Sequence, residues 1–197
     1  MVNKPLKVGF DLDGVILYNP VRVLRPLSAV LSKLIFKKKA TNFFIPKTRL
    51  TKFAWYLLHK SSFIPARGLD DLGKLVQEGK VEAHLITGRY ASLSKDFESW
   101  MKAINSNHIF ASQSHNIKNE QPHIFKQNMI KKLGLDIFVE DNWDIVRELT
   151  QATGSKLQAT GKTRIFWITN LLDKHIPHEH KFYNLRDAIQ KIKELTS

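Results

Sequence analysis

The chain of 197 residues contains no cysteine. Disulfide bonds and cysteine-ligated metals are therefore excluded, and the composition suits a reducing compartment. No stretch approaches the roughly 18 uninterrupted apolar residues that a membrane-spanning helix needs. The opening sequence, MVNKPLKVGF, holds no apolar run long enough for a signal peptide. We therefore expect a soluble, cytoplasmic protein without a transmembrane segment.

Acidic residues are missing from a long early segment. No Asp or Glu lies between Gly14 and Leu69, so all 18 acidic residues of this chain, whose net charge is +13, lie outside that segment. A segment of one sign attracts anionic partners, although a solvated basic surface explains it equally well. Its basic residues are Arg22, Arg25, Lys33, Lys37, Lys38, Lys39, Lys47, Arg49, Lys52, Lys60 and Arg67.

The rest of the chain alternates short apolar runs with helix-like periods. The hydrophobic fraction of 43% is enough for the core of one domain of ordinary size. We predict strands over 6–12, 81–88, 107–113, 135–142 and 163–169, and helices over 69–79, 91–104, 123–133, 143–152 and 183–195. This alternation predicts an α/β fold, a Rossmann-like three-layer sandwich around a mostly parallel five-stranded sheet.

The basic segment interrupts this alternation. About fifty residues separate the first strand from the helix before the second, which is too many for a plain loop. Two stripes of apolar residues at helical spacing lie within it: Leu24, Leu27, Leu31 and Leu34, then Leu50, Phe53, Ala54, Leu57 and Leu58. We predict a core domain of 1–17 and 67–197, with a small helical insertion, 18–66. Its aromatic residues could stack on nucleic-acid bases, but for Phe53 a place in a small core of the insertion is favoured.

Three of the expected strands end in a pair of polar residues. Because ligands of parallel sheets bind beyond the carboxyl ends of the strands, these residues are expected to converge. If the first strand continues, Asp11 and Asp13 share a side and need a cation between them. With Asp141 from a neighbouring strand, such oxygen ligands suit Mg²⁺. The three pairs are Asp11 and Asp13, Thr87 and Gly88, and Glu140 and Asp141.

The same strand ends can also bind phosphate. Thr87 offers a hydroxyl and Gly88 an unhindered backbone N–H to phosphate oxygens. Lys126 heads the helix before the fourth strand and can balance the phosphoryl charge. A simple turn after a strand would explain Asp11 and Asp13 alone, but it does not explain the matching polar ends of the other strands.

These residues resemble the four motifs of the haloacid dehalogenase-like (HAD) superfamily of phosphatases. DLDGV resembles motif one, LITGR motif two, Lys126 motif three and VEDN the acidic motif four. The motifs keep the family's order over 11–142, and the insertion 18–66 occupies the family's first cap position. The chain departs from many members at Ile145, where they carry a further acid; Asp144 stands one residue earlier.

The resemblance implies a covalent mechanism and a role for each residue. Asp11 would be the nucleophile that forms an aspartyl-phosphate, and Asp13 the general acid and base. Mg²⁺ would be held by the Asp11 carboxylate, the Asp13 carbonyl and Asp141, with Glu140 acting through water. The phosphoryl group would be held by Thr87, Gly88 and Lys126, and Arg89 and Asn142 would join the phosphate or brace the acids.

The implied activity is that of a Mg²⁺-dependent phosphatase acting on a phosphomonoester. The basic insertion favours a nucleotide or another polyanionic phosphate, or a phosphorylated nucleic-acid end. Two alternatives stay open. One is a module that binds nucleic acid or an anionic membrane through the insertion, with little or no catalysis. The other is a phosphotransferase or mutase with the same nucleophile. The oligomeric state is not indicated by the sequence.

Overall fold

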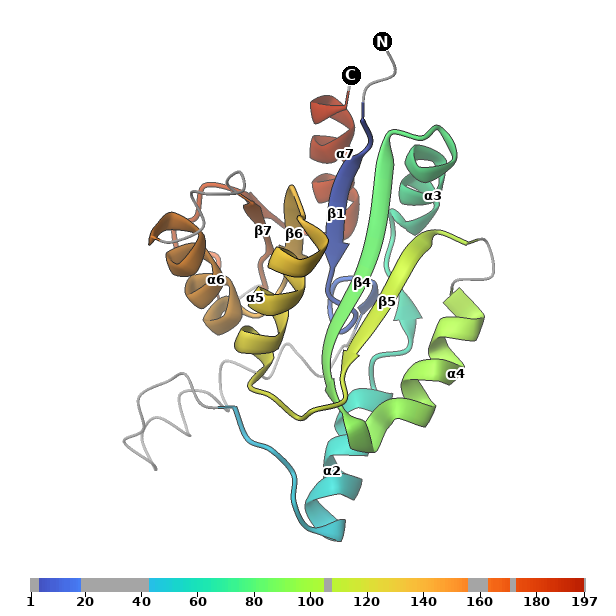
Figure 1. Cartoon of the computed structure of the whole chain (residues 1–197), viewed down its shortest axis with the longest axis vertical. Coiled ribbons are helices and arrows are strands. Elements are labelled where there is room, and N and C mark those ends of the chain that lie inside the picture. The colour runs from blue at the N-terminus through green and yellow to red at the C-terminus, as the bar shows by residue number, and fades with distance from the viewer. Residues whose placement is uncertain (1–3, 19–42, 105–107, 156–162, 171–172, 197) are drawn as a thin grey trace.

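The structure, a computed structural model, describes residues 4–18, 43–104, 108–155, 163–170 and 173–196. Strands and helices alternate along most of this length (Figure 1). The elements are β1 (Leu6–Phe10), β2 (Leu17–Tyr18), α2 (Arg49–Lys60), β3 (Ile64–Pro65), α3 (Leu69–Gln77), β4 (Val81–Tyr90), a 3-10 turn (Ala91–Leu93), α4 (Ser94–Ile104), β5 (Phe110–Asn116), α5 (Pro122–Leu133), β6 (Ile137–Glu140), α6 (Trp143–Ser155), β7 (Arg164–Ile168), β8 (Lys181–Phe182) and α7 (Leu185–Leu195).

The main sheet contains six strands in the order β5-β4-β1-β6-β7-β8. Every neighbouring pair in it is parallel. The five strands expected from the sequence are all present, which confirms the predicted α/β class. The sixth strand, β8, has only two residues, and a run that short carries no periodic signal in a sequence.

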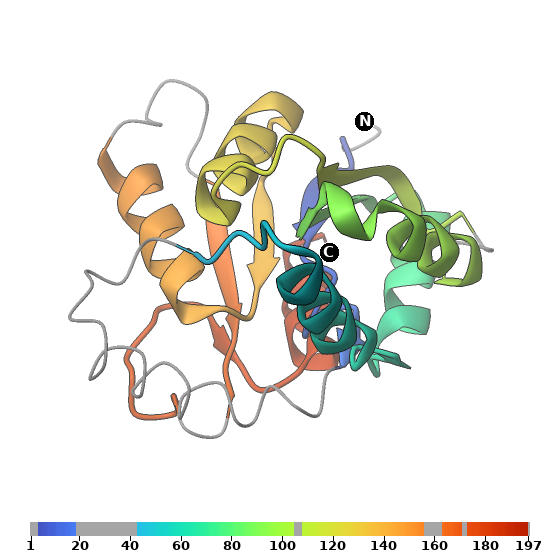
Figure 2. The ribbon, with the colours of Figure 1, turned by 90° about the horizontal axis from the view of Figure 1, so that it is seen from below.

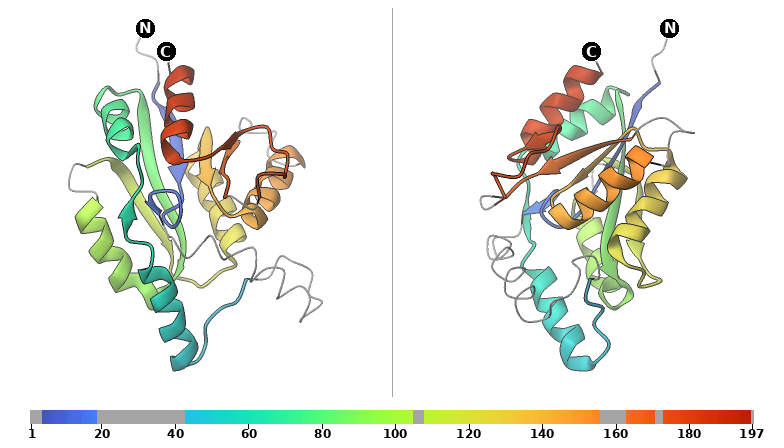
Figure 3. Two further views of the ribbon diagram at one scale, coloured as in Figure 1. Left: turned by 180° about the vertical axis from the view of Figure 1, so that it is seen from behind. Right: turned by 90° about the vertical axis from the view of Figure 1, so that its left-hand side faces the viewer.

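Two hydrophobic clusters cover the two faces of this sheet. One cluster contains buried residues of α3, α4 and α7 together with Val8 and Phe10 of β1. The other contains residues of α5 and α6 together with Phe138 and Trp167 from β6 and β7. The views agree that α3 and α7 lie on one face and α5 and α6 on the other (Figures 1 and 3). The core is therefore a three-layer α/β/α sandwich.

The central strand β1 fits closely between its neighbours. A Cβ atom at Gly9 would lie 2.5 Å from Leu135 Cδ1 and 2.8 Å from Phe138 Cδ2, so a larger residue would force these side chains apart. Phe10 is paired with Leu85 of β4 and Val139 of β6. The residue after Phe10 therefore emerges between the carboxyl ends of two parallel strands.

The first strand is shorter than predicted. It ends at Phe10, although the Asp11 N–H still donates to the Val139 carbonyl at 3.0 Å. The chain then turns from Leu12, whose carbonyl accepts from the Ile16 and Leu17 N–H groups at 3.1 and 2.8 Å. Gly14 lies within this turn, and its φ of 87° is in the left-handed region that favours glycine. The period-two alternation therefore stops before Asp13, and the premise that placed Asp11 and Asp13 on one side is wrong.

The insertion is described in part. Its two ends meet where β2 and β3 pair antiparallel, with Tyr18 opposite Ile64. The second apolar stripe forms part of helix α2. The first stripe, Leu24, Leu27, Leu31 and Leu34, lies outside the described residues. Phe53 is 59% exposed and α2 has no buried residue, so the prediction that Phe53 belongs to a core of the insertion is wrong.

Helix α2 lies at the end of the molecule opposite the two termini (Figures 1 and 2). The β1 arrow points toward this same end, so α2 lies near the carboxyl ends of the strands, where Asp11 follows β1. Within the described part of the chain, no helix combines the length and the apolar character needed to cross a membrane.

Candidate functional site

Three carboxylates meet at the ends of β1 and β6. Asp11 follows β1, Glu140 is the last residue of β6 and Asp141 comes next. One oxygen from each lies within 4.8 Å of the others, and no other such group of three metal-ligating side chains occurs among the described residues. Clustered carboxylate oxygens are the ligands that Mg²⁺ prefers. The donor set present here therefore fits that ion.

Lys126 of α5 lies against this acidic cluster. Its side chain is 2% exposed, and its Nζ lies 2.6 Å from Glu140 Oε2 and 3.0 Å from Asp11 Oδ1. Gly88 allows this approach, because a Cβ there would lie 3.1 Å from the Pro122 side chain at the start of α5. The structure thus brings together Asp11, the expected nucleophile, and the lysine that the sequence singled out.

Burial dominates the electrostatics of Asp11. The pKa of this carboxyl is raised to about 7, chiefly by removal from water and also by the charges of Glu140 and Asp13, while Lys126 opposes the shift. The pKa of Lys126 would fall through burial, but Asp11 and Glu140 raise it above its ordinary value. The lysine therefore stays charged, and a second cation beside Asp11 would favour its carboxylate form.

Asp13 is held by different partners. Its Oδ1 accepts from Arg89 Nη2 at 2.8 Å and its Oδ2 accepts from Arg89 Nε at 2.9 Å. His59 Nδ1 lies 3.1 Å from Oδ2. Burial alone would raise the pKa of Asp13, but the charges of His59 and Arg89 hold it well below its usual range. Asp13 is therefore ionised.

Arg89 links this carboxylate to a further acid. Its fully buried guanidinium also donates from Nη1 to Asp96 Oδ2 at 2.7 Å, near the start of α4. Sequence reasoning missed both Asp96 and His59. Acids are common in the first turn of a helix, and His59 lies at the end of α2, so neither residue carries a distinctive signal. Only the folding of the insertion and α4 against Arg89 reveals them.

The remaining predicted residues shape the strand ends. The buried Thr87 hydroxyl accepts from the Arg89 N–H at 3.3 Å. Glu140 Oε1 accepts from the backbone amides of Asp141 and Asn142, at 3.2 and 3.0 Å. Asn142 Oδ1 accepts from the Asp144 N–H at 3.1 Å and so begins α6. Glu140 and Asn142 therefore fix the loop that presents Asp141.

The position after motif four has a structural explanation. Ile145, where many HAD members carry an acid, is 3% exposed and packs in the cluster that covers α5 and α6. Asp144 instead lies 3.6 Å from Arg147 one turn along the same helix. Neither residue belongs to the three-carboxylate group.

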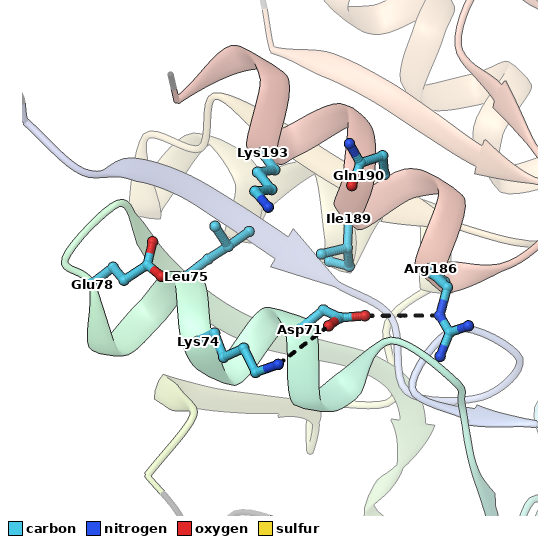
Figure 4. Close-up of a pocket in the computed structure, with 8 residues that line it drawn as sticks. All are labelled: Asp71, Lys74, Leu75, Glu78, Arg186, Ile189, Gln190 and Lys193. Atoms are coloured by element: carbon cyan, nitrogen blue, oxygen red, sulfur yellow. Dashed lines mark ion pairs between the residues drawn. The ribbon is translucent and has the colours of Figure 1, made fainter.

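A groove between α3 and α7 lies apart from these residues (Figure 4). Its charges pair with one another: Asp71 lies 4.0 Å from Lys74 and 3.8 Å from Arg186. The residues that line it do not include Asp11, Asp13, Glu140, Asp141, Lys126 or Arg89. The strand ends, where buried charges converge, are therefore the better candidate for chemistry than this groove.

Solved structures with a similar fold include HAD hydrolases. A HAD-superfamily hydrolase from Ehrlichia chaffeensis aligns over 100% of both chains, with a TM-score of 0.52 and 14% identity. CbbY from Rhodobacter sphaeroides, in complex with phosphate, covers 92% of this chain and 95% of its own, with a TM-score of 0.56 and 11% identity. A HAD family hydrolase from Salmonella enterica covers 96% of this chain and 73% of its own, with a TM-score of 0.52 and 10% identity.

No family model matches the chain, and no curated protein matches its sequence. At identities of 10% to 14%, the likeness to the solved structures concerns the fold. That fold agrees with the one implied by the order of DLDGV, LITGR, Lys126 and VEDN along the chain. The protein therefore has the HAD-like α/β fold.

Proposed function

We propose that the protein is a Mg²⁺-dependent phosphomonoester hydrolase that works through an aspartyl-phosphate on Asp11. The observation that carries this proposal is the meeting of Asp11 with Lys126, Glu140 and Asp141 at the end of a parallel sheet. A buried carboxylate, a fixed cation and an oxygen donor set are the parts that phosphoryl transfer needs. The shared fold with HAD hydrolases supports the same reaction class.

In the first step, an Asp11 oxygen attacks phosphorus and the bond from phosphorus to the leaving oxygen breaks. The Asp11 carboxylate, the Asp13 carbonyl and Asp141 would hold Mg²⁺, with Glu140 acting through water, and the ion would supply positive charge next to the phosphoryl group. The Lys126 ammonium, the Thr87 hydroxyl and the Gly88 N–H hold the same group. Their contribution is positioning and charge stabilisation in a site that largely excludes water.

Asp13 moves the protons. It gives a proton to the leaving oxygen, and then takes one from the water that attacks the aspartyl-phosphate, which releases phosphate and restores Asp11. The ionised state of Asp13 suits the second step directly. The first step requires Asp13 to gain a proton, which Arg89 and His59 oppose. Substrates with acidic leaving groups, such as phenols, therefore depend least on this proton.

The insertion 18–66 acts in this proposal as a cap that selects the substrate. Its acid-free sequence favours a nucleotide, another polyanionic phosphate or a phosphorylated nucleic-acid end. Phosphate release with Mg²⁺ should be measured across mononucleotides, sugar phosphates, and oligonucleotides phosphorylated at the 3′ or 5′ end. We expect nucleotides or oligonucleotide ends to be preferred. A clear preference for small sugar phosphates would contradict the charge-based selection.

Hydrolysis must also be separated from phosphoryl transfer to another hydroxyl. Asp13, which would activate water in this proposal, favours hydrolysis. We expect the rate of phosphate release to be unchanged when sugar alcohols are added as acceptors. A phosphorylated acceptor that forms at the expense of free phosphate would instead establish a phosphotransferase or mutase.

A further inference from the structure

Helix α2 presents its apolar side chains to solvent. In the described part of the chain, twelve large hydrophobic side chains are exposed, and eight of them belong either to the segment 43–64 or to Tyr18. On α2 itself, Leu50 is 78% exposed and Leu57 is 52% exposed. The eight are Tyr18, Phe44, Leu50, Phe53, Leu57, Leu58, Phe63 and Ile64. A concentration of this kind marks an interaction surface, since single exposed apolar residues are normally scattered.

The exposed stripe is opposite the face by which α2 contacts the rest of the protein. Trp55 and His59 are half-buried, and His59 reaches Asp13. With 3.6 residues per turn, Leu50, Phe53 and Leu57 share a face that lies roughly half a turn away from these two residues. The helix is therefore attached by its C-terminal end, and its apolar stripe faces away from the protein.

Basic side chains border this stripe. Arg49 and Lys60 lie beside the stripe on the helix and Lys47 just precedes the helix; all three are exposed, and α2 contains no acidic residue. The insertion residues outside the described part add six more basic residues and no acid. Because the surface has one sign of charge, pairing with a second copy of the same face is disfavoured. An occupant must instead be apolar beneath and anionic at its surface.

We propose that α2 is a docking helix for an anionic lipid surface. Leu50, Phe53 and Leu57 would enter the boundary between headgroups and acyl chains, while Arg49 and Lys60 would contact the anionic headgroups. Single-stranded nucleic acid fits less well, because its recognition uses aromatic platforms along a basic groove and the stripe here is largely aliphatic on a projecting helix. The position of α2 at the end of the molecule leaves it accessible to a flat surface (Figures 1 and 2).

The test uses the full chain and co-sedimentation with vesicles of phosphatidylcholine, with and without phosphatidylglycerol. We expect binding only to the anionic vesicles, and weaker binding at high salt. Leu50→Ser with Leu57→Ser, and separately Arg49→Glu with Lys60→Glu, should each reduce the bound fraction. Each basic side chain at such a surface changes the partition about fivefold, so the double charge reversal should weaken binding roughly 20-fold or more.

Matched controls come from other faces. Ile117→Ser with Ile124→Ser removes apolar side chains that are also exposed, and Lys131→Glu with Lys132→Glu reverses two exposed charges on α5. Both controls should bind like wild type. Asp11→Asn, which lacks the proposed nucleophile, should bind the anionic vesicles like wild type, so docking and the proposed hydrolysis can fail independently.

Three results would overturn the proposal. The first is a lack of binding to anionic vesicles, or equal losses in the α2 variants and their controls. The second is a large loss of thermal stability in Leu50→Ser with Leu57→Ser, which would show that the chain itself covers the stripe. The third is binding of a single-stranded oligonucleotide that depends on Arg49 and Lys60, without binding to vesicles, which would assign the surface to nucleic acid.

Discussion

The strand ends and helix α2 depart from the usual distribution of side chains in opposite directions. At the strand ends, Lys126 and Arg89 are buried although they are charged, and each is paired with two carboxylates. On α2, Leu50 and Leu57 are exposed although they are apolar. Buried charges and clustered exposed apolar groups are the informative exceptions in a folded protein. One region is therefore suited to a reaction, and the other to contact with a partner.

The two regions should also respond to substitution in opposite ways. Removing one member of a buried charge group leaves its partner uncompensated in a medium of low dielectric constant. Removing an exposed apolar group removes little from the folded state. Stability and chemistry are therefore coupled at the strand ends and separate on α2. The following predictions test this contrast, starting with the largest expected effect.

Asp13→Asn removes the proposed proton carrier. We expect the hydrolysis of an alkyl phosphate to fall by about a hundredfold to ten-thousandfold, the usual contribution of general acid–base catalysis. An aryl phosphate should lose less, because its leaving oxygen needs little protonation. Initial rates with both substrates measure this difference. Equal losses on the two substrates would exclude Asp13 as the acid.

Lys126→Met leaves Asp11 and Glu140 without their buried cation. We expect the free energy of unfolding without Mg²⁺ to fall by about 3–5 kcal/mol, as for other broken buried pairs. Mg²⁺ should restore part of this loss, because it neutralises the same carboxylates. Urea unfolding with and without Mg²⁺ measures both effects.

Lys131→Met is the matched control for this variant, since Lys131 is exposed on the same helix. Its free energy of unfolding should change by less than about 0.5 kcal/mol. If Lys126→Met cost no more than Lys131→Met, the cluster would not be the coupled charge group described here.

Asp11 should make the stability of the metal-free protein depend on pH. Burial raises its pKa from 3.8 to about 7, so the folded state keeps a proton that the unfolded chain releases. The stability that this proton provides is complete below about pH 4 and is lost as the pH rises through about 7. We therefore expect Asp11→Asn to become progressively more stable than wild type over this window. A difference in unfolding free energy that does not vary with pH would contradict the raised pKa.

A pair of leucines tests the contrast at its smallest effect. Leu50→Ala on α2 should change the free energy of unfolding by less than about 0.5 kcal/mol, as expected at an exposed site. Leu85→Ala, in the fully buried core of β4, should cost about 2–5 kcal/mol. Thermal or urea unfolding of the two variants decides the point. A large cost at Leu50 would show that its stripe is covered.

Much of the core could be predicted from periodicity alone. Each of the five expected strands is present, because buried parallel strands leave apolar runs such as IFVE in β6. The convergence of Asp11, Lys126 and Glu140 also followed from the rule that parallel strands end at one edge of the sheet. These features depend on local pattern and on a fixed topology, both of which a sequence carries.

Other features depend on packing that a sequence does not encode locally. The expected alternation of side chains, which placed Asp11 and Asp13 on one side, ended early because β1 stops at Phe10 and the chain then turns through Gly14. Asp13 forms ion pairs with Arg89 and His59, and Arg89 also forms one with Asp96. Phe53 was predicted to be buried and is exposed. Helical spacing predicts which residues share a face of a helix, but it does not say whether that face points inward or outward.

The most direct test of the central claim is Mg²⁺-dependent hydrolysis of an aryl phosphate by wild type and by Asp11→Asn, with folding checked by circular dichroism. We expect wild type to be active with Mg²⁺ and inactive after chelation. Asp11→Asn should be folded and at least about a thousandfold slower, because it lacks the nucleophile. Equal activity of the two proteins, or activity that survives removal of Mg²⁺, would contradict the account.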